Sequence, residues 1–177
     1  MKKKTLALVL ALTLLVAGVV GGTLAWLTDQ TAEVKNTFTV GDINIGLTET
    51  TTDYKMVPGN AIAKDPTVTV KANSEACWLF VKVTESENLD TFITYAIADG
   101  WTALPGVDGV YYREVPASAA DQTFSVLADD AVTVKSDVTR TMLETAKTDA
   151  PTLTFQAYAV QKDNVASASD AWAKVNP

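Results

Sequence analysis

Apolar and polar residues alternate along most of the chain beyond residue 33, and this two-residue period is typical of half-buried β-strands. It occurs far more often than the 3.6-residue period of an amphipathic helix. The alternation predicts strands over residues 34–40, 43–47, 67–70, 77–84, 92–97, 110–115, 123–127, 132–134 and 152–160. Helix-favouring composition is confined to residues 138–148 and 169–174. The chain is therefore predicted to be a β protein with one or two short helices.

The strongest predicted strand covers residues 77–84. Alternation places Cys77, Leu79, Val81 and Val83 on one face and Trp78 and Phe80 on the other. Because apolar side chains occur on both faces, we expect a central strand that is covered on each side.

Turn residues separate the predicted strands. Pro58-Gly59 and Asp65-Pro66 precede the strand at residues 67–70, and Asp99-Gly100 and Asp108-Gly109 follow later. Proline fixes φ and glycine accepts positive φ, so these pairs favour turns. Many short strands separated by turns predict an antiparallel β-sandwich or a jelly roll over residues 36–177.

The N-terminus has the pattern of an export signal. Lys2, Lys3 and Lys4 are followed by an apolar stretch over residues 5–20, which is typical of a signal helix. Thr23 and Ala25 then place small side chains at positions −3 and −1 of a peptidase site. We predict a signal peptide over residues 1–25, with cleavage between Ala25 and Trp26.

An uncleaved membrane helix is the alternative for this region. The uncharged stretch over residues 5–28 is long enough to cross a bilayer of about 30 Å, although Gly18, Gly21 and Gly22 weaken a helix near its end. We favour cleavage. Before cleavage, the chain is expected to contact the membrane only through the signal. After cleavage, the mature chain should be soluble outside the membrane.

Charge and composition exclude several functions. The formal net charge is −7, with 14 basic and 21 acidic side chains, whereas nucleic-acid binding depends on Lys and Arg that neutralise phosphates. The chain has no histidine, which excludes Ser-His-Asp triads, Cys-His dyads and His-based zinc sites. Its single cysteine excludes an internal disulfide.

The remaining candidate sites have structural alternatives. Asp129-Asp130 and Glu85-Ser-Glu87 could bind calcium, but neither completes a calcium-loop motif, so we predict no metal and no cofactor. Cys77 lies on an apolar face without a basic neighbour and is expected to be a small buried hydrophobe. Three aromatics, Trp101, Tyr111 and Tyr112, could form a sugar-binding platform, although core packing is favoured.

Several blocks of the sequence resemble the TasA and camelysin family of exported proteins from Gram-positive bacteria. The most specific block is Gly-Thr-Leu-Ala-Trp-Leu-Thr-Asp at residues 22–29, followed by residues 36–47. Residues 57–59, 76–83, 155–161 and 170–172 are also similar. The resemblance implies a jelly-roll sandwich whose signal is removed by a SipW-like peptidase. It also implies assembly into extracellular fibres of the biofilm matrix.

The family mechanism implies that the freed N-terminal segment of one subunit adds as a strand to the sheet of the next. This segment would be residues 26–35, with the donor strand over residues 26–34. Trp26 and Leu27 would be its anchors, and Thr28, Asp29 and Val34 would lie along it. The alternative is that Trp26 and Leu27 fold back onto their own domain.

We therefore expect a structural matrix subunit that self-associates and can bind other matrix proteins. Its expected location is the extracellular matrix or the cell surface. Two alternatives remain. The first is a monomeric surface or secreted module that binds carbohydrate or protein. The weaker one is a camelysin-like peptidase, a label that the absence of histidine contradicts, because a zinc peptidase usually needs a His-Glu-x-x-His helix. We predict no enzymatic activity.

Overall fold

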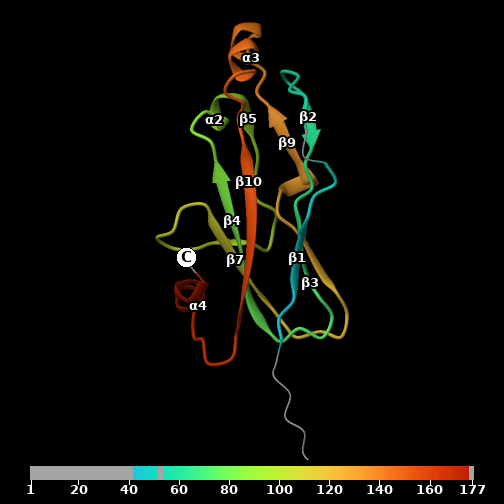
Figure 1. Cartoon of the computed structure of the whole chain (residues 1–177), viewed down its shortest axis with the longest axis vertical. Helices are drawn as coiled ribbons and strands as arrows, with labels where there is room; N and C mark the ends of the chain where they lie inside the picture. Colours follow the sequence, from blue (N-terminus) through green and yellow to red (C-terminus); the bar gives the residue numbers. More distant parts are fainter. Residues whose placement is uncertain (1–41, 52–53, 176–177) are drawn as a thin grey trace, which may run out of the picture. The chain divides into compact units, whose positions relative to one another are not determined.

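Ten β-strands in three antiparallel sheets form the main secondary structure of the computed structural model, which describes residues 42–51 and 54–175 (Figure 1). The first sheet has the order β1 (Ile45–Thr48), β3 (Thr67–Val70) and β8 (Gln122–Ser125). The second has the order β10 (Leu153–Gln161), β4 (Cys77–Glu85), β7 (Val110–Val115) and β6 (Thr102–Ala103). The third has the order β2 (Ala61–Ala63), β9 (Ala131–Val134) and β5 (Ile93–Thr94). This architecture confirms the prediction of a β protein and is consistent with a β-sandwich.

The helical segments are short. They are α2 (Leu89–Phe92), the 3-10 turn η1 (Ala128–Asp130), α3 (Arg140–Ala146) and α4 (Ala168–Val175). The predicted helices over residues 138–148 and 169–174 correspond to α3 and α4. Thr139 caps α3 by accepting a hydrogen bond from the Met142 amide at 3.3 Å, because a hydroxyl at this position satisfies an otherwise unpaired N–H group. None of the helices in the described part of the chain has the length and apolar character needed to span a bilayer.

The main core lies between the first and second sheets. Val68 and Val70 of β3 pack against Leu79 and Val81 of β4, and all four side chains are at most 1% exposed. The alternation seen in the sequence explains this arrangement, since every second residue of each strand points to the same face.

The opposite face of β4 is covered by α4. Trp78 and Phe80 point to this side, where Phe80 lies 5.3 Å from Trp172 between ring centroids. Ser167 begins the helix, because its hydroxyl accepts a hydrogen bond from the Asp170 amide at 3.1 Å. The predicted central strand with two covered faces is confirmed, and Figure 1 shows β4 and β10 side by side.

A third cluster fills the end of the fold near α3. Phe92 of α2, Val134 of β9 and Leu127 form its centre, and Met56, Ile62 and Leu153 pack at its edge. This cluster packs against Leu153, the first residue of β10.

One predicted strand, over residues 92–97, is mostly wrong. The structure ends α2 at Phe92, limits β5 to Ile93–Thr94, and leaves Ile97 in a single bridge to Leu127. Leu89 and Phe92 are both buried at a three-residue spacing, which favours one helical turn over continued pairing. Strands β2 and β6 were not predicted, because two or three residues are too few to show a period. The predicted strand over residues 34–40 lies outside the described residues.

The predicted turn at Asp108-Gly109 is confirmed and depends on glycine. Gly109 has φ +71°, and a Cβ at this position would lie 2.5 Å from the Val83 carbonyl oxygen. The Val83 amide donates a hydrogen bond to the Gly109 carbonyl at 2.7 Å. A side chain would therefore separate the turn from β4.

Candidate functional site

Strand β10 is a long edge strand without the usual protection against further pairing. It pairs with β4 in nine residue pairs, and within the described residues it has no strand on its other side. Its sequence, LTFQAYAVQ, contains no charge, no proline and no glycine. Edge strands are commonly protected by shortness, charge or proline. The other edge strands of the described sheets have two to four residues, so β10 is the edge most suited to accept another strand.

Strand β1 lies close to β10 without pairing with it. Each is the edge strand of its own sheet, and their Cα atoms approach within 8 Å. A strand inserted between two others requires them to stand about 9.6 Å apart, which is twice the spacing of paired strands. Because the closest Cα atoms are at most 8 Å apart, insertion beside β10 requires β1 to move away by at least roughly 1.6 Å. We call this unpaired boundary the β1/β10 seam.

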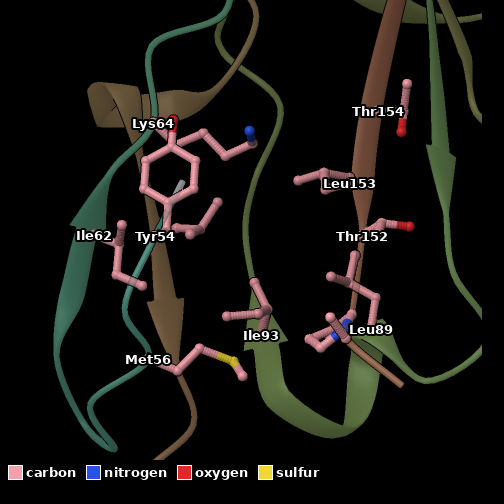
Figure 2. A pocket seen from close by; sticks show the side chains of 12 residues that line it. Tyr54, Met56, Ile62, Lys64, Leu89, Ile93, Thr152, Leu153 and Thr154 are labelled. Atoms are coloured by element: carbon pink, nitrogen blue, oxygen red, sulfur yellow. The ribbon is translucent and has the colours of Figure 1, made fainter. Parts of the chain in front are cut away.

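A pocket of about 470 Å³ lies beside the first residues of β10. Figure 2 shows Leu153 pointing from β10 toward β2 and β9, with Met56 and Ile93 at one end of the pocket and Lys64 at the other. Its apolar lining comprises Met56, Ile62, Leu89, Ile93, Val132 and Leu153. We call it the Leu153 pocket. It offers room for apolar side chains next to an unpaired strand edge.

A buried cation closes one end of the Leu153 pocket. Lys64 is 7% exposed, and its Nζ donates a hydrogen bond to Glu49 Oε1 at 2.6 Å. The ammonium also lies 4.9 Å from the centroid of the Tyr54 ring and 5.3 Å from that of Phe155. Ring faces attract cations, so the two aromatics and Glu49 together compensate the burial of Lys64.

Glu49 is shared by two donors. The Tyr54 hydroxyl donates to Glu49 Oε1 at 2.9 Å. Burial raises the pKa of Tyr54 well above its usual value, and the hydrogen bond and negative charge of Glu49 raise it further. Tyr54 therefore stays neutral and holds Glu49 in place beside Lys64.

The opposite wall of the pocket is fixed by hydrogen bonds between distant segments. The Thr152 amide donates to Ser86 Oγ at 2.8 Å, and the Ser86 amide donates to the Thr152 carbonyl at 3.0 Å. Asn88 Nδ2 donates to the Asp149 carbonyl at 2.9 Å. These bonds attach the loop before β10 to the start of α2. Polar contacts therefore fix both this wall of the pocket and the end at Lys64.

The predicted processing and donor residues lie outside the described residues. They are Thr23, Ala25, Trp26, Leu27, Thr28, Asp29 and Val34.

The candidate calcium residues do not converge. Within residues 42–51 and 54–175, no group of three or more His, Cys, Asp or Glu side chains is arranged to hold a metal ion. Asp129 and Asp130 have positive φ angles of 56° and 48°, and they are the last two residues of η1, where the chain turns into β9. Glu85 instead accepts a hydrogen bond from the Tyr95 hydroxyl.

The three candidate platform aromatics are packing residues. Tyr111 packs on the core between the first two sheets, whereas Tyr112 packs with Trp78 and Phe80 on the opposite face of the second sheet. The Trp101 indole donates a hydrogen bond to the Ser125 carbonyl at 2.8 Å. Residues on opposite faces cannot form one flat surface, so the predicted core role is the one the structure supports.

Cys77 is fully buried, as the sequence predicts, and burial raises the pKa of its thiol from 9.0 to about 11. The neutral thiol is the form that folding favours. Its contribution to stability is therefore complete below pH 9 and is lost as the pH rises through about 11.

Labelling of Cys77 by a thiol reagent at pH 8 is expected to occur at the unfolding rate. The native thiol is buried and neutral, whereas the thiolate is the reactive form. The measurement compares native protein with protein in urea, and the urea sample should react at least about 100-fold faster. Equal rates would show that the thiol is accessible in the native state.

The polar residues of the pocket were missed by sequence reasoning. Lys64 precedes Asp65-Pro66, and this local sequence is typical of an exposed turn. Glu49 and Tyr54 lie in a polar stretch between two strands. Lys64 is buried where Glu49, Tyr54 and Phe155 of β10 meet around its ammonium, and no local sequence pattern contains the contact with Phe155.

Comparison with known proteins gives no relative. No protein-family model, no curated protein and no solved structure matches the chain.

Proposed function

We propose that this chain is a secreted structural subunit of extracellular biofilm-matrix fibres, with a jelly-roll sandwich that polymerises by N-terminal strand donation. Removal of residues 1–25 by a signal peptidase would free the donor, residues 26–34. The observation that carries the proposal is the unprotected edge of β10, nine residues long and next to β1.

Strand addition suits this edge physically. Unpaired N–H and C=O groups of an edge strand bind an extended segment through main-chain hydrogen bonds, and adjacent pockets select its side chains. The donor has nine residues, which equals the length of β10. The Leu153 pocket supplies a place for apolar anchors beside the same edge.

The first experiment compares the mature chain beginning at Trp26 with a chain that lacks residues 26–34. We expect fibres by electron microscopy from the first and a monomer by size exclusion from the second. A chain with residues 26–34 in scrambled order controls for length and charge, and it should polymerise poorly. Fibres of equal yield from the truncated chain would refute strand donation by this segment.

A mixing experiment tests the acceptor separately. The truncated chain keeps β10 and the seam, so it should bind the free donor at a fibre end without offering a donor of its own. Substoichiometric amounts are therefore expected to shorten the fibres. Unchanged fibre length would mean that the truncated chain has no acceptor.

A further inference from the structure

The Leu153 pocket has two chemically different ends, and this difference constrains what can bind there. One end is lined by Met56, Leu89 and Ile93, which are apolar. The other end holds the ammonium of Lys64 (Figure 2). A ligand matched to this pocket is an extended peptide with an apolar side chain at one position and a carboxylate further along.

Lys64 retains hydrogen-bonding capacity toward such a peptide. An ammonium has three N–H donors, and among the described residues Lys64 Nζ makes one hydrogen bond, to Glu49. The rings of Tyr54 and Phe155 lie beside the ammonium, with their centroids 4.9 and 5.3 Å from Nζ. The remaining donors can meet a carboxylate brought to β10.

The strand period determines which donor residues can share the pocket. Alternate residues of a strand point to one face, about 6.8 Å apart. If residues 26–34 form a strand, Leu27 and Asp29 would point to one face of it, and Trp26 and Thr28 would point to the other. On β10, Leu153 and Phe155 have the same relation, and both pack toward the pocket side of the sheet.

We propose that the Leu153 pocket of one copy binds Leu27 and Asp29 of the next, with Leu27 at the apolar end beside Leu153 and Asp29 at Lys64 beside Phe155. The donor then runs parallel to β10. This assignment rests on the proposed strand donation and adds its register, its direction and the charge pair that selects it.

The test uses the mature chain beginning at Trp26 and measures the critical concentration for fibre formation by sedimentation. Asp29→Lys is expected to raise this concentration at least about 10-fold, since like charges would meet at Lys64. Asp99→Lys makes the same change of charge at an exposed residue before β6, at the opposite edge of the sheet from β10, and its effect should stay within about 3-fold. Neither substitution alters a residue of the Leu153 pocket or of β10, so both leave the acceptor intact.

A charge reversal supplies the reciprocal test. Glu49→Lys with Lys64→Glu exchanges the buried pair, and adding Asp29→Lys to this double variant should restore assembly relative to the double variant alone. Circular dichroism establishes whether the exchanged pair folds. If it does not fold, the comparison of Asp29→Lys with Asp99→Lys decides the question.

The outcomes separate this inference from the proposed function. Fibres that require residues 26–34 but respond equally to Asp29→Lys and Asp99→Lys would overturn the Lys64 contact and leave strand donation standing. A wild-type chain that stays monomeric would overturn both. A monomer that Asp29→Lys destabilises thermally would overturn both as well, and would show that the segment occupies its own pocket.

Discussion

Phe80→Ala should lower the free energy of unfolding by about 4 kcal/mol. Phe80 is fully buried in β4 and packs against Tyr112 and Trp172, with centroid distances of 6.3 and 5.3 Å. Truncation removes the transfer free energy of a phenyl ring and leaves a cavity, and such changes cost about 3–5 kcal/mol. For a domain of this size the melting temperature should fall by roughly 15 °C.

Urea unfolding monitored by tryptophan fluorescence measures this effect. Phe80→Leu is the graded control, since it keeps part of the volume, and it should cost less than half as much. Thr84→Ala changes an exposed residue of the same strand and should stay within about 0.5 kcal/mol of the wild type. A cost below about 1 kcal/mol for Phe80→Ala would contradict the packing of α4 onto β4.

Glu49→Leu should destabilise the fold by about 3 kcal/mol, because it leaves the ammonium of Lys64 without its carboxylate. The two side chains are 9% and 18% exposed for Lys64 and Glu49, respectively. Removing one member of a buried ion pair costs about 3–5 kcal/mol, whereas replacing both with apolar residues is often neutral. The low end of that range applies here, since the ammonium lies at an open pocket.

The double variant Glu49→Leu with Lys64→Met is the matched control for this prediction. Its free energy of unfolding, measured in the same urea titration, should lie within about 1 kcal/mol of the wild type. If the double variant is no more stable than Glu49→Leu alone, then the lost packing of Glu49 is responsible and the charge of Lys64 is not.

Strands with several alternating residues were the part of the fold that sequence could predict. Residues 110–115 form β7 with the predicted bounds, and the two faces of residues 77–83 pack as the alternation requires. These strands carry enough residues for a period to emerge. Strand β2, with the sequence Ala-Ile-Ala, depends on pairing with β9, and that partner lies about 70 residues further along the chain.

The edge of β10 and the Leu153 pocket could be predicted from the sequence even less well than the short strands. The sequence predicts a strand over residues 152–160, but not that it lies at the edge of its sheet next to β1. Likewise, Lys64 is buried by Phe155, a residue far from it in sequence. Edge position and burial of a charge are properties of the assembled sheets, and no short pattern encodes them.

Strand β4 is packed on both faces, and this has a consequence for local opening. Its inner face belongs to the sandwich core and its outer face to the cluster under α4. Exposing the amides of β4 to solvent therefore requires both hydrophobic clusters to separate together. In deuterated water these amides should exchange last, at the rate of global unfolding. A substitution that loosens α4 should also speed amide exchange in β3, which packs on the opposite face of β4.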